Sequence, residues 1–534
     1  MAGAVLNCLR LMRAGIVLAQ HGVRFWPKGM RVPLVLHLAR IATLPITILT
    51  WPFRIGKPRN RRISDALGSL GPSYIKLGQF LATRADVIGS DLANDLSFLQ
   101  DKMPPFSMGE ARRAIGESLQ GSLEDNFIAF GPPVAAASIA QVHKGRARNR
   151  KTGEEADVAV KILRPGIERR FKADLDSYYF AASMVERFHA PSRRLKPLAV
   201  VDNLKRTTDL EMDLRLEAAA ISEMADNISK AGETDFRVPN VDWQRTSKRV
   251  LTLEWIEGIP VADRDRLREA GHDLEQLGLT ILRTFLRHAM RDGFFHADMH
   301  QGNLFVDKDG KVVAVDFGIM GRLSHIERKF LAEILHGLIT RDFRRAAAIH
   351  FEAGYVPPHH SIETFAQAMR AIGEPIHGRT AEEISMADLL GQLFAYTELF
   401  DMETRPELIL LQKSMVIVEG VARSLNPNLN MWTAAEPVAR EWVEENLGVS
   451  GQMRNAGAGA ADLGRAVGQL PQIASRAQTT MAAIEDIASN GVKLNEKAVR
   501  NFAKEQARTG RWGRLALWVG AAALVAIAYS NFAG

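Results

Sequence analysis

Three side chains in the middle of the sequence have the types and spacing that phosphoryl transfer requires. Asp298 lies in the run His-Ala-Asp-Met-His-Gln-Gly-Asn, and Asn303 follows it five residues later. Asp316 opens an Asp-Phe-Gly tripeptide a little further on. Phosphoryl transfer needs oxygen ligands for Mg²⁺ and a group that orients or deprotonates the nucleophile. The spacing predicts that Asp298 is the catalytic group and that Asn303 and Asp316 bind the metal ion.

A lysine upstream of these residues could contact the phosphates of a nucleotide. Lys161 ends the run Val-Ala-Val-Lys, whose β-branched residues predict a strand. In protein kinases a lysine so placed touches the α- and β-phosphates and pairs with a helix glutamate, for which Glu217 is the candidate. The motifs occur in the order found in kinases, so the expected cofactors are ATP and Mg²⁺. His296 and His300 could instead bind a metal beside Asp298, but no further histidine or cysteine cluster completes such a set.

The loop expected to cover the phosphates is rich in alanine rather than glycine. No GxGxxG motif occurs upstream of Lys161. Alanine adopts positive φ less readily than glycine, so this loop should be stiffer than a glycine-rich one. An ordinary alanine-rich turn is the alternative. The residues predicted to bind ATP are Val134, Ala135, Ala136, Ala137, Ser138, Ile139, Ala140, Gln141, Val142, Lys161 and Glu217.

The elements around these motifs predict a small sheet joined to a helical body. Short apolar runs at 157–163 and 249–255 are typical of strands, and 303–317 is typical of a hairpin. The stretches 171–230 and 325–447 have helical periodicity. We therefore expect an α+β, bilobal protein-kinase-like fold with an N-terminal helical extension and a C-terminal transmembrane helix. The expected segments are a basic apolar N-terminal helical segment (1–62), a helical extension (63–120), a smaller lobe (121–258), a larger lobe (259–449), a helical tail (450–511) and the transmembrane helix (512–532).

Composition narrows the class of protein. The chain has 534 residues, of which 46% are hydrophobic and 24% are charged, as in ordered globular proteins. Cys8 is the single cysteine, which excludes an internal disulfide framework and a cysteine-based zinc site.

The charge is distributed unevenly along the chain. The first 64 residues contain 11 lysines and arginines and no acidic residue, while the whole chain has a net charge of +7, so the remainder is acidic on balance. A basic, apolar segment on an acidic body indicates contact with a membrane surface that contains anionic lipid. A solvated basic face and a mitochondrial transit peptide are the alternatives. Nucleic acid is not expected as a partner, because the sequence has no recognition motif or platform of base-stacking aromatics.

Two apolar stretches bear on membrane attachment. Leu515–Tyr529 is apolar, follows three arginines and is short for a membrane span, but it predicts a single transmembrane helix. A tail helix that packs against a partner is the alternative. The arginines would remain in the cytoplasm and keep the body of the protein there. Val32–Phe53 is interrupted by charged residues and proline, so we expect an interfacial or core-packing helix.

Two further motifs make the resemblance more specific. Lys76-Leu77-Gly78-Gln79 is a KxGQ motif, and Glu211-Met212-Asp213 is an ExD motif. Together with the alanine-rich loop, they resemble the UbiB family of atypical kinases, which is linked to ubiquinone (coenzyme Q) biosynthesis. The resemblance covers about residues 62–447. It implies that the helix with Lys76 and Gln79 covers the kinase cleft as a regulatory lid, with Lys76 close to the carboxylates of Glu211 and Asp213.

The resemblance also implies a function. The expected protein is a membrane-bound atypical kinase or ATPase that supports ubiquinone biosynthesis at the bacterial inner membrane, with the mitochondrial inner membrane as the alternative. A covered cleft would exclude protein substrates, so ATP hydrolysis or phosphorylation of a small acceptor is expected. Expected partners are anionic lipid, polyprenylphenol or quinone intermediates and other enzymes of ubiquinone biosynthesis; a homodimer stays open. Two other functions also remain: a small-molecule kinase of the aminoglycoside or choline type, and a non-catalytic scaffold that presents lipid intermediates.

Overall fold

The computed structural model describes residues 2–23, 50, 58–82, 88, 92, 95, 96, 99, 103–149, 152–188, 193, 196–377, 396, 399–402 and 406–447. The chain divides into two compact units, Met1–Glu445 and Asn446–Gly534, and nearly all described elements belong to the first. Within the described residues, every helix is too short or too polar to cross a bilayer. The predicted transmembrane helix at 512–532, the tail at 450–511 and most of Val32–Phe53 lie outside the described residues.

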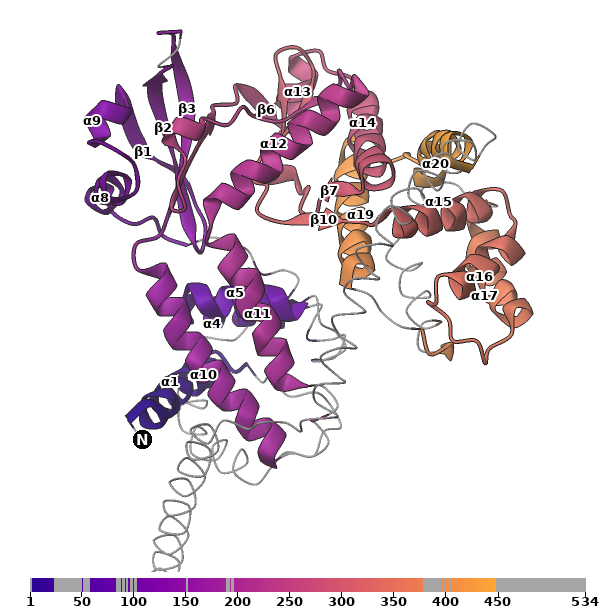
Figure 1. Ribbon diagram of the computed structural model, residues 1–534, viewed down its shortest axis with the longest axis horizontal. Helices are drawn as coiled ribbons and strands as arrows, with labels where there is room; N and C mark the ends of the chain where they lie inside the picture. Colours follow the sequence, from indigo (N-terminus) through magenta and orange to yellow (C-terminus); the bar gives the residue numbers. More distant parts are fainter. Residues whose placement is uncertain are drawn as a thin grey trace, which may run out of the picture. The chain divides into compact units, whose positions relative to one another are not determined.

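A four-stranded antiparallel sheet forms the smaller lobe in the order β1-β2-β3-β5. Its strands are β1 (Ala129–Ala136), β2 (Ala140–Arg148), β3 (Glu155–Leu163) and β5 (Val250–Glu254). Val158, Val160 and Ile162 of β3 face a core formed with α8 (Met108–Ser118). Because successive side chains of a strand point to opposite faces, Lys161 lies on the other face of the sheet. Figure 1 shows α8 and α9 (Leu123–Asn126) beside this sheet.

Three long helices follow β3 and precede β5. They are α10 (Ile167–Phe188), α11 (Pro197–Glu211) and α12 (Leu214–Ala231). Asp213 caps the start of α12 by accepting a hydrogen bond from the backbone N–H of Arg215, and Gly232 ends the helix in a left-handed conformation. Glu217 belongs to the apolar stripe of α12 that is buried against the rest of the lobe. The helix therefore holds this carboxylate on the same side of the sheet as Lys161.

The N-terminal helices pack against α10 and α11 (Figure 1). They are α1 (Ala2–Gln20), α4 (Arg59–Leu70) and α5 (Pro72–Ala82). Gly78, the glycine of the KxGQ motif, lies where α5 crosses α4. A Cβ atom at this position would lie 2.7 Å from Cδ1 of Leu67, so the buried Leu67 side chain would have to shift to accommodate it. The motif therefore contains a packing requirement as well as a charged side chain.

The larger lobe is mostly helical and carries two small sheets. The hairpin predicted at 303–317 is present as β8 and β9, and a parallel strand, β4, extends it. Arg237 of β4 pairs with Glu254 of β5 and with Asp307 of β8, which ties this sheet to the sheet of the smaller lobe. The remaining elements are β4 (Phe236–Arg237), η3 (Trp243–Arg245), β6 (Gly258–Pro260), α13 (Arg264–Glu269), α14 (Leu274–Arg287), η4 (His288–Asp292), β7 (Phe294–His296), η5 (Gln301–Asn303), β8 (Leu304–Asp307), β9 (Val312–Ala314), β10 (Met320–Arg322), α15 (His325–Ile339), α16 (Phe343–Glu352), α17 (Ile362–His377), α19 (Pro406–Leu425) and α20 (Met431–Leu447).

Candidate nucleotide-binding site

Lys161 lies between two carboxylates that come from distant parts of the chain. Its Nζ atom lies 2.8 and 2.9 Å from the two carboxylate oxygens of Glu217 and 2.7 Å from Oδ1 of Asp316. Burial alone would lower the pKa of Lys161, but attraction to Asp316 and Glu217 raises it above its ordinary value. Burial raises the pKa of Glu217, and the contact with Lys161 partly offsets that effect. The lysine therefore remains a cation and is held between the two carboxylates.

Asp316 follows β9 in a left-handed backbone conformation, with φ of +63°. This conformation is uncommon for a residue other than glycine, although aspartate tolerates it better than most, and such residues are concentrated at functional sites. The charge of Lys161 holds the pKa of Asp316 well below its usual range, and its hydrogen bond adds to this effect. The Asp316 side chain is 51% exposed, so the ionised carboxylate remains accessible.

His296, a buried residue at the end of β7, links the loop that carries Asp298 to the strand before Asp316. Its Nδ1 accepts a hydrogen bond from the backbone N–H of Asp298, and its Nε2 lies 3.2 Å from the carbonyl oxygen of Val315. Burial lowers the pKa of His296, which favours the neutral ring that these two contacts require. Both ring nitrogens of His296 thus contact the backbone. In this structure His296 supports the loop, whereas the alternative from the sequence was a metal ligand.

Asn303 is buried at the start of the hairpin. Its side-chain N–H donates a hydrogen bond of 3.0 Å to the carbonyl oxygen of Asp298. The amide oxygen of Asn303 takes no part in this bond. The backbone carbonyl of Asn303 accepts a hydrogen bond from the backbone N–H of Val315. The hydrogen bonds therefore connect Asp298, Asn303 and the strand that leads to Asp316. The amide oxygen of Asn303 and the carboxylate of Asp316 are oxygen ligands of the kind that Mg²⁺ prefers.

The alanine-rich segment is largely part of β1 and β2, and the turn between them comprises residues 137–139. Arg164, which the sequence analysis did not single out, holds this turn. Its guanidinium donates hydrogen bonds to the carbonyl oxygens of Ala137 and Ser138 and to that of Pro104. A trans peptide directs its N–H opposite to its C=O, so the N–H groups of Ser138 and Ile139 point away from Arg164. No sequence motif marks this arginine, because its partners are backbone atoms.

The predicted ATP-binding residues of the segment differ in their surroundings. Val134 and Ala135 are exposed, Ala136, Ala137 and Val142 are partly exposed, and Ser138, Ile139 and Ala140 are buried. The side chain of Gln141 is buried and bonds to both the N–H and the carbonyl of Phe106 as well as to the ring of His143. The amide of Gln141 therefore fastens the segment before α8 to β2.

The helix that carries the KxGQ motif approaches the site. Nζ of Lys76 lies 2.7 Å from Oε2 of Glu211, and both side chains are largely shielded from solvent. The charge of Lys76 also contributes to the low pKa of Asp316, after the larger effect of Lys161. Gln79 lies on the same helix and is partly buried. The structure thus brings Lys76 to the first carboxylate of the ExD motif and near the carboxylate that begins Asp-Phe-Gly.

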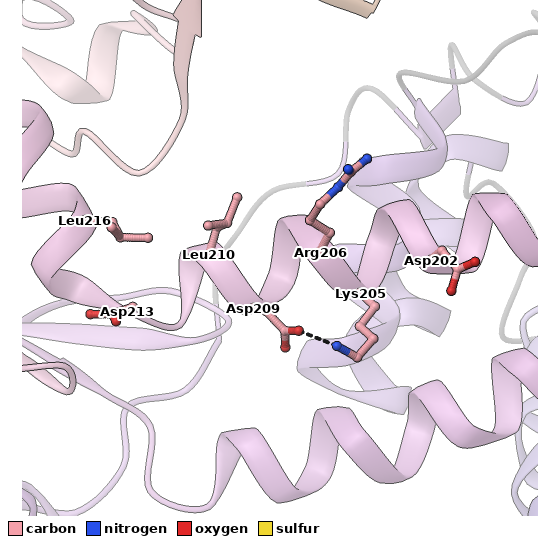
Figure 2. A pocket seen from close by; sticks show the side chains of 7 residues that line it. All are labelled: Asp202, Lys205, Arg206, Asp209, Leu210, Asp213 and Leu216. Carbon is pink, nitrogen blue, oxygen red and sulfur yellow. Dashed lines mark hydrogen bonds and ion pairs between the residues drawn. The ribbon is translucent and has the colours of Figure 1, made fainter. Parts of the chain in front are cut away.

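The second carboxylate of the ExD motif has a different partner. Asp213 accepts two side-chain hydrogen bonds from Arg215, of 2.8 and 2.6 Å, and these contacts lower its pKa. It also lines a pocket of about 450 Å³ on the surface of α11 and the start of α12, shown in Figure 2. Lys205 in this pocket already pairs with Asp209. None of the residues that line this pocket is one that the sequence predicts for nucleotide or metal binding.

The segment after Asp-Phe-Gly is short. β10 begins at Met320, pairs with β7, and is followed directly by α15 at His325. Arg322 of β10 pairs with Glu223 of α12 through two hydrogen bonds. In protein kinases the corresponding segment carries a phosphorylation site and lies where activation is controlled. Here it is a short strand, and Arg322 joins it to α12.

The fold and the site define a kinase-like protein, and comparison with known proteins agrees. Residues 98–350 match the model of the ABC1 atypical kinase-like domain, and residues 369–430 match that of the UbiB helical domain. The chain is 37% identical over 477 residues to a probable protein kinase UbiB of Marinobacter nauticus, which covers 88% of this chain and 85% of that protein. The chain therefore belongs to the UbiB family of atypical kinase-like proteins, as the sequence motifs predicted.

A solved structure is also similar. The complex of Rv3197 with erythromycin from Mycobacterium tuberculosis matches with a TM-score of 0.43 and 22% sequence identity, covering 74% of this chain and 97% of that chain.

Proposed function

We propose that this protein binds Mg-ATP in the cleft beside Lys161 and uses its turnover to support ubiquinone biosynthesis at a membrane. The observation that carries the proposal is the contact of Lys161 with both Glu217 and Asp316, which come from different elements. In a phosphoryl-transfer site a lysine on a strand of the sheet binds the phosphates, and the aspartate of Asp-Phe-Gly binds Mg²⁺. Belonging to the UbiB family supports the link to ubiquinone.

The residues of the site have distinct roles in this proposal. Lys161 would bind the α- and β-phosphates, while Asn303 and Asp316 would hold Mg²⁺, which neutralises charge that develops on the phosphates. Asp298 would orient the attacking hydroxyl or water, because it lies on the loop that His296 fixes to the strand before Asp316. All four groups are present and are held by contacts within the chain, which favours turnover over a site that binds nucleotide without reaction.

The acceptor is proposed to be water or a small molecule, not a protein. The Lys76–Glu211 ion pair places α5 near Asp316, and the chain between Asp-Phe-Gly and α15 is short. Both features limit the space and the surface that an extended peptide would need. The small acceptor or ligand that we propose is a polyprenylated phenol intermediate, which would be found in a membrane.

We also propose attachment to the bacterial inner membrane. The support comes from the sequence: the first 64 residues are basic and free of acidic residues, and the apolar run at 515–529 follows several arginines. Anionic lipid would attract the basic segment, and the apolar run would anchor the chain.

A deletion strain complemented with variants tests the proposal. Wild type and Asp309→Asn, a control in an exposed turn of the β8–β9 hairpin, should restore normal quinone levels by mass spectrometry. Asp298→Asn and Asp316→Asn should instead accumulate a phenolic precursor. The purified Asp316→Asn protein should also lose Mg²⁺-dependent ATP binding. The proposal fails if this variant binds Mg-ATP and restores quinone levels as the wild type does.

A further inference from the structure

Two adjacent histidines and an aspartate lie together on the larger lobe, away from the nucleotide site. Nε2 of His359 lies 3.6 Å from Oδ2 of Asp401, and Nε2 of His360 lies 3.3 Å from the same oxygen. The imidazole rings have their centroids 4.2 Å apart. One potential ligand atom from each of the three residues lies within 4.8 Å of the other two. Two imidazoles and a carboxylate thus converge on one point, although forty residues of chain separate the histidines from the aspartate.

The local structure explains how neighbouring residues can point the same way. Pro357 and Pro358 precede the histidines and restrict the backbone, because proline fixes φ and limits the residue before it. The backbone N–H of His360 donates a hydrogen bond to the carbonyl oxygen of Pro357, which closes a turn. In a turn, unlike a strand, consecutive side chains are not forced to opposite sides. Both rings are therefore presented on one side before any ligand binds.

The aspartate is also held in place by packing. Phe400, the residue before Asp401, is buried in a cluster with Val356 and Phe365. Its ring packs edge-on against His360, with centroids 5.4 Å apart, and against Phe365 at 4.9 Å. The segment that carries Asp401 is thus fixed against the turn by apolar contacts. The three polar groups need not be ordered by the ligand itself, which reduces the cost of binding.

The distances are compatible with a tetrahedral metal, although His360 also lies within hydrogen-bond distance of Asp401. Zinc binds imidazole nitrogen and carboxylate oxygen at about 2.0–2.2 Å, so two ligand atoms of a tetrahedral site lie roughly 3.3–3.5 Å apart. The separations of 3.3 and 3.6 Å are close to this value.

We infer that His359, His360 and Asp401 form a binding site for a divalent transition-metal ion such as Zn²⁺. Imidazole and carboxylate ligands suit zinc, and water would complete the tetrahedron because His359 and Asp401 are exposed. The ion joins the turn between α16 and α17 to the segment before α19. These segments are far apart in sequence, so the ion stabilises the helical part of the larger lobe without taking part in ATP chemistry.

Titration of the full-length, untagged and chelator-treated protein with ZnCl₂ tests this site. Isothermal titration calorimetry at neutral pH should show one site of micromolar affinity or tighter, and the melting temperature should rise by a few degrees because zinc binds the folded state preferentially. His359→Ala, His360→Ala and Asp401→Asn should each weaken zinc binding about tenfold or more and remove the thermal shift. Asp401→Asn retains the size of the side chain, and circular dichroism checks that each variant is folded.

Two matched controls address other zinc ligands on the surface. His325→Gln removes an exposed histidine at the start of α15, and Cys8→Ser removes the exposed thiol. Both should bind zinc as the wild type does. The inference is overturned if the wild type binds no zinc, which would leave a simple ion pair. It is equally overturned if the three ligand variants bind zinc as tightly as the controls.

Discussion

Nζ of Lys76 lies 2.7 Å from Oε2 of Glu211, and each of the two side chains is less than one-seventh exposed. The pair joins α5 to the end of α11, which leads directly into α12 and Glu217. One ion pair therefore connects the KxGQ helix to the end of α11, just before the helix whose Glu217 contacts Lys161. It is far better shielded than the Lys205–Asp209 pair on the outer side of α11, where each side chain is about half exposed (Figure 2).

Loss of Lys76 should destabilise the fold. Lys76→Met leaves the shielded Glu211 carboxylate without its partner, so the free energy of unfolding should fall by about 1–3 kcal/mol. The double variant Lys76→Met/Glu211→Leu also removes the carboxylate, so it should recover most of the lost stability. Urea denaturation in a double-mutant cycle measures this recovery. Lys205→Met should leave the midpoint nearly unchanged. Purely additive effects of Lys76→Met and Glu211→Leu would contradict the pairing.

Replacement of Lys161 should separate stability from nucleotide binding. Lys161→Met leaves the buried carboxylate of Glu217 without its lysine partner. Breaking a buried pair in this way lowers the free energy of unfolding by about 3–5 kcal/mol. Lys161→Met/Glu217→Leu replaces both charges with apolar groups, so it should regain much of the stability. It should not regain Mg-ATP binding, because the cation for the phosphates is absent. Urea denaturation and equilibrium dialysis with ATP measure the two effects; ATP binding by the double variant at wild-type affinity would refute the role of Lys161.

The polar residues that the structure brings together at the candidate site are easier to recognise in the sequence than the residues that support them. Metal ligands and phosphate-binding cations require particular residue types, so Lys161, Asp298, Asn303 and Asp316 stand out at characteristic spacings. Arg164 does not, because it binds carbonyl oxygens, which every residue possesses. The sequence predicts that Gln141 binds ATP, and the hydrogen bonds of its amide to the backbone of Phe106 could not be foreseen. Hydrogen bonds to the backbone leave no signature at the accepting residue.

In the fold, too, the local pattern of an element can be predicted from the sequence, but its packing partner cannot. Alternation in 157–163 indicates that one face of the strand is buried, and the buried Val158, Val160 and Ile162 agree with it. The periodicity of the helix at 108–118 likewise predicts a buried face, but not its partner. The structure places that face on the sheet of the smaller lobe rather than with the other N-terminal helices. Such a choice depends on contacts between segments that are distant in sequence, which amphipathic patterns do not specify.

Acidification should destabilise the protein through its buried histidines. Burial lowers the pKa of His350 in the folded state, whereas an unfolded histidine titrates near about 6.5. Below that pH the unfolded chain binds a proton that folded His350 does not, so the free energy of unfolding falls as the pH decreases from about 6.5 toward the folded pKa. His143 and His296 act in the same direction.

His350→Gln should make this fall shallower. Its amide can still donate to the carbonyl oxygen of Ala346, which His350 contacts in the wild type. A single histidine contributes at most about 1.4 kcal/mol per pH unit, so urea denaturation at pH 7.5, 6.5 and 5.5 can resolve the change in slope. His325→Gln, an exposed control, should retain the wild-type slope. An identical slope in His350→Gln would show that His350 protonates equally in both states.

The contacts of Arg164 predict an effect on nucleotide affinity from a residue outside the kinase motifs. Its guanidinium holds the carbonyls of Ala137 and Ser138, and its backbone N–H donates to that of Ile139. These bonds fix the turn so that the following N–H groups face away from the arginine. Arg164→Met removes the side-chain bonds and should allow the turn to reorient. ATP affinity should then fall about tenfold, equivalent to about 1.4 kcal/mol, while the Mg²⁺ dependence is retained.

Arg169→Met is the matched control, because Arg169 is exposed on α10 a short distance further along the chain. It should bind ATP as the wild type does. Fluorescence titration with a labelled ATP analogue, with and without Mg²⁺, gives both quantities. If Arg164→Met binds ATP as tightly as Arg169→Met, the turn does not depend on the arginine and the alanine-rich segment is stiff enough by itself. If Arg164→Met loses the Mg²⁺ dependence as well, the arginine acts on the metal-binding residues rather than on the turn.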